Sequence, residues 1–372
     1  MAEKMTPRER VKAVYEGVTP DRVPLMLDLS HWYKKNYNVF FDLTGFSGVD
    51  HELVALHKKS GAVLYIETGN HFDIYYDDSI SHRTYTDSTG IFHTEIETPE
   101  GQISEERVFS AESYSYHIRK WLVRSTKDLQ VLEYAMKRRH CRPRFERYRA
   151  WSDAAGDLGF IYTFLSYSGL GFLISRYMGV ENTILAMYDY PVEFERFIRT
   201  VNDVNLQILD DILDGPFDVL IVGDNHDAYV QSPEMFMKYT YDYYEEIARR
   251  VHEKGKYLAV HVDGEMKGLL GLMAKCGADC IDAATPHPMF SLTPIQARRE
   301  AGDDLILSGG IPATLFGSTG TDSEFIDAVK RWLDIRKKSS RLILAAGDQV
   351  PIDAPWHRIE MLADLVDQYG QY

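Results

Sequence analysis

The sequence has few cysteines and no excess of basic residues. Only three cysteines occur among 372 residues, Cys141, Cys276 and Cys280. They are too few and too unevenly spaced for a disulfide framework, so we expect a reducing compartment and a cytoplasmic protein. Lys and Arg total 41 against 56 Asp and Glu, which gives a net charge of -15. Such a chain offers no basic surface for phosphates, and this argues against nucleic-acid binding and a polybasic membrane anchor.

Long apolar segments are also missing. No run approaches the roughly 20 apolar residues of a membrane-spanning helix. The charged start, residues 1–10, lacks an apolar core of signal-peptide length, so we expect a soluble and unprocessed protein. With 45% hydrophobic residues, the chain is long enough for a full core in about one or two domains of roughly 150 residues each.

Short apolar runs recur along the whole chain, each followed by a turn and then by helical periodicity. The runs do not alternate with polar residues, as expected for parallel strands covered on both faces. There are eight of them: 23–27, 62–66, 160–165, 218–222, 257–262, 280–283, 305–308 and 342–346. Eight strand–helix units predict an α/β protein of the (β/α)8 TIM barrel type. A doubly wound sheet is the alternative, but no Gly-x-Gly-x-x-Gly turn follows the first run.

Helices are clearest late in the chain, where we predict them over 233–253, after Ser232-Pro233-Glu234, and over 323–338. Residues 72–118 depart from this succession of apolar runs and helices. Apolar and polar side chains alternate over 91–97, and Thr98-Pro99-Glu100-Gly101 supplies a turn. This pattern is typical of antiparallel hairpins. We therefore predict one barrel domain over 1–372 with inserted hairpins at about 72–118, after the second strand.

In a (β/α)8 barrel, functional residues lie where strands end and loops begin on the C-terminal face. A carboxylate or histidine follows six of the eight predicted strands. Together with tyrosines at the third strand, these ends give the candidate site residues: Asp28, His31, Glu67, Tyr162, Tyr167, Asp224, His226, His261, Asp263, Asp282 and Asp348. Any single Asp among them is at least as well explained as the cap of the following helix.

The sharpest local cluster is His261-Val262-Asp263 at the end of the fifth strand. Residues two apart in a strand point to the same side, so the imidazole and the carboxylate can converge on one ion or substrate group. Zinc or a harder divalent metal would suit them if a third ligand arrived from elsewhere, and Asp348 is the candidate. The alternative is that His261 and Asp263 bond to each other and to the barrel rim.

Two weaker signals remain. Cys276 and Cys280 fall at a helix–strand junction on the opposite face, and we interpret them as buried packing residues without thiol chemistry. Gly309 and Gly310 follow the seventh strand. They could admit a phosphate or carboxylate close to the backbone, or simply form a tight turn.

Several segments in chain order point to one family. They are Met5-Thr6-Pro7-Arg8-Glu9-Arg10 with Pro20-Asp21-Arg22-Val23-Pro24, Gly223-Asp224-Asn225 with Ser232-Pro233-Glu234-Met235-Phe236, His261-Val262-Asp263-Gly264, and Gly347-Asp348-Gln349-Val350-Pro351-Ile352-Asp353-Ala354-Pro355. Together they resemble the uroporphyrinogen decarboxylase superfamily nearly from end to end. The resemblance implies a (β/α)8 barrel with a funnel at its C-terminal face.

The first-strand loop separates two branches of that superfamily. The decarboxylases carry an arginine-rich loop there that binds tetrapyrrole carboxylates, whereas this chain reads Leu27-Asp28-Leu29-Ser30-His31-Trp32-Tyr33. An acid in place of arginines would repel a polycarboxylate. The hairpin region and the segment 121–128 are similar to the other branch, methyltransferases that use zinc and a corrinoid protein. The resemblance therefore favours corrinoid-dependent methyl transfer.

One departure from that branch bears on the substrate. The family's zinc-binding His-x-Cys is His261-x-Asp263 here, and the position of the distant Cys is Asp348. Oxygen ligands make a harder ion, suited to polarising an ether or alcohol oxygen rather than to activating a thiol. We expect a methyl ether or related O-methyl donor, with the methyl group passing to a corrinoid carried by a partner protein. The loss of both cysteines equally fits a site without metal, in which the carboxylates bind substrate directly.

The expected roles follow from this reading. His261, Asp263 and Asp348 hold the metal, and Asp224, His226 and Glu67 are catalytic, with Asp224 or His226 handling the proton of the leaving oxygen. The residues expected to bind the donor are Asp28, His31, Tyr162, Tyr167 and Asp282. Part of the surplus of 24 tyrosines and 17 phenylalanines is expected to face the funnel and to suit an uncharged or aromatic ligand.

Two other functions stay open. One is a decarboxylase of a small aromatic or pyrrolic acid. The other is a non-catalytic partner of a corrinoid protein, although many ionisable groups at strand ends argue against it. The chain is also compatible with a homo-oligomer.

Overall fold

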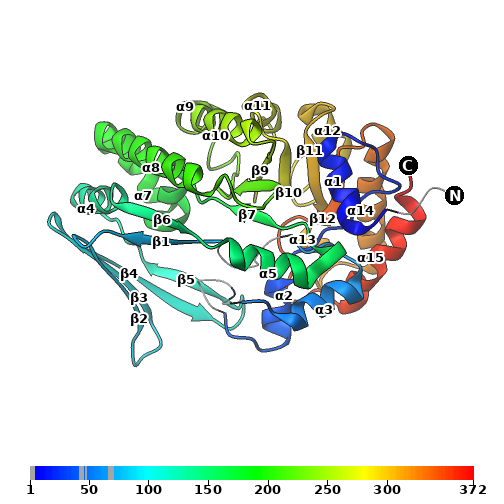
Figure 1. Ribbon diagram of the computed structural model, residues 1–372, viewed down its shortest axis with the longest axis horizontal. Coiled ribbons are helices and arrows are strands. Elements are labelled where there is room, and N and C mark those ends of the chain that lie inside the picture. Colours follow the sequence, from blue (N-terminus) through cyan, green and yellow to red (C-terminus); the bar gives the residue numbers. More distant parts are fainter. Residues whose placement is uncertain (1–4, 42–45, 47, 66–70) are drawn as a thin grey trace.

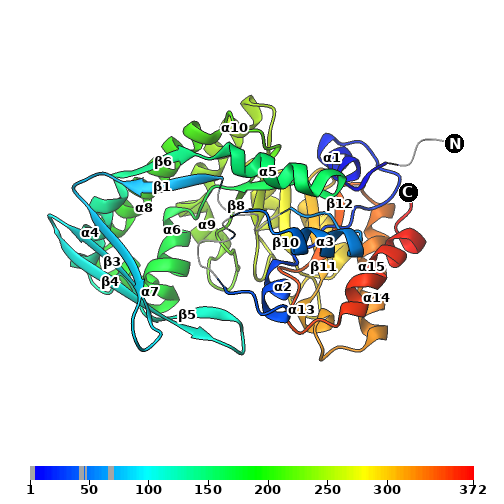
Figure 2. The same ribbon diagram turned by 60° about the horizontal axis from the view of Figure 1, so that its bottom comes forward.

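A parallel sheet forms the centre of the molecule (Figures 1 and 2). The computed structural model describes residues 5–41, 46, 48–65 and 71–372. Six strands pair in the order β12-β11-β10-β9-β8-β7, and every pair is parallel. Their bounds are β7 (Tyr162–Phe164), β8 (Val219–Val222), β9 (Tyr257–His261), β10 (Cys280–Ala284), β11 (Ile306–Ile311) and β12 (Leu342–Ala346).

Two short N-terminal segments close this sheet into a ring. Leu25 bridges in parallel to Leu344 of β12, Met26 bridges to Val63, and Leu64 bridges to Gly159 just before β7. The Met26 amide donates to the Leu344 carbonyl at 2.9 Å, and the Val63 amide donates to the Leu25 carbonyl at 2.9 Å. The two segments correspond to the first two predicted strands. The predicted (β/α)8 TIM barrel is therefore confirmed.

The apolar core has two layers, as a barrel requires. Inward-facing side chains form one cluster, to which α1 (Pro7–Glu16) contributes Val11, Val14 and Tyr15. The alternate residues of the same strands, such as Leu220 and Val222, belong to a second cluster shared with the surrounding helices. Because every strand is covered on both faces, its sequence reads as a continuous apolar run rather than an alternating one.

The helices lie around the outside of the barrel (Figure 2). Several begin at strong caps: Thr6 and Thr321 each form a capping box with the Glu three residues later. The helices other than α4 are α1 (Pro7–Glu16), α2 (Ser30–Asn36), α3 (His51–Ser60), α5 (Phe145–Ala155), α6 (Gly169–Phe172), α7 (Gly179–Asp189), α8 (Pro191–Ile212), α9 (Pro233–Tyr239), α10 (Tyr241–Glu253), α11 (Leu270–Lys275), α12 (Pro294–Ala301), α13 (Ala313–Phe316), α14 (Asp322–Leu333) and α15 (Trp356–Tyr369). Short 3₁₀ turns occupy Gly156–Leu158 and Asp334–Lys337, and a π turn occupies Leu173–Tyr177.

Both predicted late helices are present, with different bounds. The segment predicted as one helix over 233–253 is divided at Thr240 into α9 and α10, which bury separate apolar residues. The helix predicted over 323–338 ends at Leu333 and continues as the 3₁₀ turn Asp334–Lys337. No helix of the described residues is long and apolar enough to cross a membrane.

The predicted hairpin insertion is confirmed, and it extends beyond residue 118. Its four antiparallel strands pair in sequence order, and Thr98 and Gly101 face each other across the predicted turn. The strands are β2 (Ser81–Thr86), β3 (Phe92–Thr98), β4 (Gly101–Ser110) and β5 (Ser115–Lys120). They project away from the barrel at the lower left of Figure 1.

The insertion continues to Pro143 because later residues pack back onto it. α4 (Thr126–Met136) lies against the sheet and shares a core cluster with Ile96 and Ile103. β6 (Arg139–Pro143) then pairs antiparallel with β1 (Phe72–Tyr76). The helical periodicity of α4 does not differ from that of a barrel helix, so its place in the insertion is not evident from the sequence.

Candidate active site

Strand alternation identifies the side chains that face the mouth of the barrel. The lower inward layer includes Met26, Tyr162, Ile221, Ala259, Cys280 and Ile306. Side chains two residues later point to the same side of each strand. The upper layer, at the carboxyl ends of the strands, therefore comprises Asp28, Phe164, Gly223, His261, Asp282 and Ser308.

His261 is the centre of an acidic cluster in this upper layer. Its Nδ1 lies 2.9 Å from Oδ2 of Asp282, and its Nε2 lies 3.7 Å from Oδ1 of Asp348. Burial alone would lower the pKa of His261, but the hydrogen bond to Asp282 and the charges of Asp282, Asp348 and Asp263 outweigh burial and raise that pKa to about 9. The three carboxylates thus share one imidazole between them.

Asp263 lies at the rim of the same cluster. Its side chain reaches solvent, yet partial desolvation by the walls of the mouth and the charge of Asp348 raise its pKa to about 6. The alternative contact predicted from the sequence, a hydrogen bond between His261 and Asp263, is absent: Nδ1 of His261 bonds to Asp282 instead.

A backbone irregularity sets the position of Asp282. The register between β10 and β11 shifts between Ile281 and Ala284, and Ala283 has a positive φ of 65°. Such bulges re-aim side chains and occur often beside active sites. Asp282 is 1% exposed, and its second oxygen, Oδ1, has no hydrogen-bond partner among the described residues. Asp282 is therefore placed to orient His261 and is not exposed to solvent. Its predicted direct contact with the methyl donor is not supported by this position.

A metal ion fits this donor set in part. Zinc bonds of about 2.1 Å place two ligand atoms of a tetrahedral site roughly 3.4 Å apart, close to the separation of His261 Nε2 and Asp348 Oδ1. In metal sites a carboxylate behind the histidine ligand usually fixes its tautomer, and Asp282 has that position relative to His261. Within the described residues no group of three His, Cys, Asp or Glu is already close enough to hold an ion, so Asp263 would have to turn inward.

Asp224 and His226 do not belong to the mouth. Both side chains are completely buried. Asp224 accepts hydrogen bonds from the Ser168 amide before α6 and from the Tyr244 hydroxyl at 2.9 Å. His226 Nε2 lies 2.9 Å from the same hydroxyl, and burial lowers its pKa to about 3. Both side chains are buried against Tyr244, and their role in proton transfer stays a prediction.

The buried carboxyl of Asp224 makes a testable contribution to stability. Burial raises its pKa to about 6 from an ordinary value of 3.8. Between about pH 4 and pH 6 the folded state therefore binds more protons than the unfolded state, and stability falls as the pH rises through this window. Asp224→Asn keeps an acceptor for the Ser168 amide and is expected to remove this fall. Urea unfolding of both proteins at pH 4, 5, 6 and 7 measures it, and parallel pH curves would contradict it.

The two candidate residues after the first strand, Asp28 and His31, form hydrogen bonds within the surrounding loops. Asp28 is 4% exposed, and its Oδ1 accepts the Ser30 amide at 2.8 Å where α2 begins. His31 Nε2 lies 3.2 Å from the Tyr114 carbonyl in the β4–β5 turn, so it joins the insertion to the barrel. These positions do not support the predicted direct contact of Asp28 or His31 with the methyl donor. Glu67, predicted to be catalytic, lies outside the described residues.

The two candidate tyrosines of the third strand occupy buried positions. Tyr162 is 3% exposed in the lower layer, where its hydroxyl bonds to that of Tyr15. Tyr167 is 7% exposed and accepts a hydrogen bond from Arg176 at 2.9 Å. The side chain of Tyr162 lies one layer below the mouth, and its contact with the methyl donor stays a prediction. The aromatic residue that does reach the mouth is Phe164, two positions later, and strict application of the two-residue alternation would have found it.

The glycine pair and the cysteines are structural. A Cβ on Gly309 would lie 2.4 Å from the Ala284 carbonyl oxygen, and one on Gly310 would lie 2.2 Å from the Trp332 ring. Close packing thus accounts for both glycines without a bound phosphate. Cys276 and Cys280 are buried, and burial raises the pKa of each thiol. This agrees with the prediction that both are packing residues.

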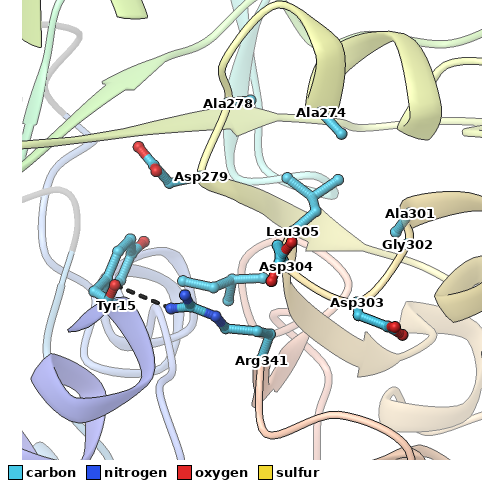
Figure 3. A pocket seen from close by; sticks show the side chains of 11 residues that line it. Tyr15, Ala274, Ala278, Asp279, Ala301, Gly302, Asp303, Asp304, Leu305 and Arg341 are labelled. Atoms are coloured by element: carbon cyan, nitrogen blue, oxygen red, sulfur yellow. Dashed lines mark hydrogen bonds between the residues drawn. The ribbon is translucent and has the colours of Figure 1, made fainter. Parts of the chain in front are cut away.

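A separate cavity of about 300 Å³ lies at the other end of the barrel (Figure 3). Asp279, Leu305 and Arg341, which line it, come immediately before β10, β11 and β12. Arg341 donates to the main-chain carbonyl of Tyr15 at 3.0 Å. The guanidinium therefore ties α1 to the barrel, and this cavity is remote from the His261 cluster.

Comparison with known proteins identifies the family. Residues 172–369 match the uroporphyrinogen decarboxylase (URO-D) family, which is more than half of the chain. A search of curated proteins found no match. A methyltransferase from Methanosarcina mazei has the same fold, with a TM-score of 0.64 at 14% identity over 98% of this chain and 99% of that chain.

A weaker likeness is to a B12-independent methionine synthase from Shewanella sp. W3-18-1, with a TM-score of 0.44 at 10% identity over 86% of each chain. It is too distant to support an argument. The matched region contains β8 to β12 and hence His261, Asp282 and Asp348. The chain belongs to the uroporphyrinogen decarboxylase family.

Proposed function

We propose that the protein is a methyltransferase that takes a methyl group from a small O-methyl donor and passes it to a cobalt corrinoid on a partner protein. The observation that carries the proposal is the His261 cluster, in which one imidazole lies among the carboxylates of Asp263, Asp282 and Asp348 at the barrel mouth. The fold shared with a methyltransferase agrees with it. The first-strand loop, with Asp28 where decarboxylases carry arginines, argues against a tetrapyrrole polycarboxylate.

The cluster also suggests which residues would hold a divalent metal. His261 Nε2, Asp348 and Asp263 are the candidate ligands, and Asp282 fixes the imidazole from behind. A bound divalent ion would act as a Lewis acid on the donor's ether oxygen and make the methyl group easier to remove.

The reaction breaks the carbon–oxygen bond of the donor. The methyl group passes to cobalt(I), and the oxygen keeps the electron pair and takes a proton. Because Asp224 and His226 are buried, that proton comes from solvent at the open mouth. Within the chain, His261 would hold the donor oxygen at a fixed place, and Asp282 would keep the imidazole of His261 in position.

A methyl-transfer assay tests the proposal. The protein is mixed with a cobalt(I) corrinoid carrier and a panel of aryl methyl ethers, methanol and methylamines, and the absorbance of methylcobalt is followed. We expect methylcobalt with at least one O-methyl compound. The absence of methylcobalt across the whole panel would contradict the proposal.

Metal content provides a second, independent prediction. Protein purified without chelator is expected to contain about one divalent ion per chain, and Asp263→Ala is expected to lose most of it, because one of three ligands is removed. Elemental analysis of both proteins measures this, with His252→Ala as a control at the His252–Asp279 pair on the opposite face, 2.8 Å apart. A wild-type protein without metal would leave the carboxylates as direct substrate ligands.

A further inference from the structure

Phe164 is an unusually exposed residue for a barrel strand. It ends β7 and is 40% exposed, whereas Tyr162 and Thr163 before it are 3% and 0% exposed. Single exposed apolar residues are common on outer surfaces. Phe164 instead occupies the inward-facing upper layer, because it lies two residues after Tyr162 of the barrel interior. Its ring therefore forms part of the wall of the mouth.

Gly223 makes room for this ring. A Cβ at position 223 would lie 2.2 Å from Cε2 and 2.6 Å from Cζ of Phe164. The φ of Gly223 is not positive, so backbone conformation does not demand glycine here and the close approach of the ring does. The ring thus extends from β7 across the end of β8.

The position of Gly223 relates Phe164 to the acidic cluster. Val222 pairs with Val260 in the β8–β9 register, so Gly223 and His261 are neighbours at the next position. Adjacent strands lie roughly 4.8 Å apart, and the ring over Gly223 therefore lies within about 10 Å of His261. Tyr167 supports the ring from one side in a T-shaped contact, with centroids 6.0 Å apart and planes at 76°.

We infer that Phe164 is the stacking surface for an aromatic ring of the methyl donor, so that the donor class is aryl methyl ethers. Stacking on this ring would remove exposed apolar surface from water on both partners and bring a ring substituent toward His261. Methanol and methylamines have no ring and would gain nothing from Phe164. That the aromatic ligand is a methyl donor rests on the proposed function. The binding of its ring to Phe164 can be measured without methyl transfer.

The experiment compares binding of 2-methoxyphenol with binding of methanol, without corrinoid, by ligand-observed NMR titration. Phe164→Leu removes the aromatic face and keeps an apolar side chain, and Gly223→Ala displaces the ring without altering it. Both are expected to weaken 2-methoxyphenol binding about three- to tenfold and to leave methanol binding unchanged. Phe164→Tyr keeps the ring and is expected to restore binding. Tyr229→Ala, at an aromatic residue that is 77% exposed in the β8–α9 loop, is the matched control and is expected to bind as the wild type does.

The outcomes separate this inference from the proposed function. If folded Phe164→Leu and Gly223→Ala proteins, checked by circular dichroism, bind 2-methoxyphenol as tightly as the wild type, Phe164 is not the stacking surface, even when methyl transfer is found. Weak binding by every protein overturns it as well. If the two variants lose binding and the wild type transfers no methyl group, Phe164 is still the surface that stacks an aromatic ligand, and the methyl-transfer proposal fails.

Discussion

His261→Asn is expected to lower the rate of methyl transfer to a corrinoid roughly thousandfold. The asparagine amide can take the place of Nδ1 and still donate to Asp282, so the buried carboxylate keeps a partner. What the variant loses is Nε2, the atom that faces Asp348 at 3.7 Å. The expected effect is therefore on chemistry and metal content, with little change in the folded structure.

The measurement is the initial rate of methylcobalt formation at saturating donor, together with thermal unfolding. The matched control is His252→Asn, which alters a histidine paired with Asp279 on the far side of the barrel. A His261→Asn protein with at least a tenth of the wild-type rate would show that the imidazole does not hold the reacting centre. Loss of activity in His252→Asn to the same degree would point to general damage instead.

Gly310→Ala is expected to lower the free energy of unfolding by about 3–5 kcal/mol. Two effects add at this position. The φ of Gly310 is 103°, which disfavours any side chain, and the new Cβ would lie 2.2 Å from the ring of Trp332. Trp332 cannot move aside easily, because it is completely buried and its Nε1 donates to the Ile343 carbonyl at 2.9 Å.

Denaturant unfolding of Gly310→Ala measures the loss, and Gly255→Ala separates its two causes. Gly255 also has a positive φ, 66°, but nothing lies within 4 Å of its Cβ position. Its replacement is expected to cost only about 1 kcal/mol. Equal losses in the two variants would show that contact with Trp332 is unimportant. Weaker binding of an anion, without loss of stability, would support the alternative that this glycine pair binds phosphate or carboxylate.

The barrel was predictable because its strands carry their own signal. Strands buried on both faces consist of uninterrupted apolar residues, as in Val219–Val222 and Leu342–Ala346. Eight such runs, without a Gly-x-Gly-x-x-Gly turn after the first, indicate the barrel. The ends of such strands also point to the site. His261 and Asp348 lie together at the mouth although 87 positions separate them in the sequence.

The sequence did not indicate which of the side chains at the strand ends are buried. Asp224 follows β8 as a catalytic residue would, but Tyr244 from α10 and the Ser168 amide before α6 pack around its carboxyl and bury it. Asp282 was expected to bind the donor, but the bulge at Ala283 and the contact with His261 make it a positioning residue. These features depend on tertiary contacts between distant segments, for which the local sequence carries no signal.

The most direct test of the account follows one methyl group from donor to cobalt. The protein is incubated with reduced corrinoid carrier and 2-methoxyphenol labelled with ¹³C in its methyl group, and the products are identified by NMR. The account predicts one labelled methyl–cobalt for each catechol released, and neither product with His261→Asn. Release of carbon dioxide from a pyrrole or aromatic carboxylic acid without corrinoid, with no labelled methyl–cobalt formed, would contradict it and identify a decarboxylase.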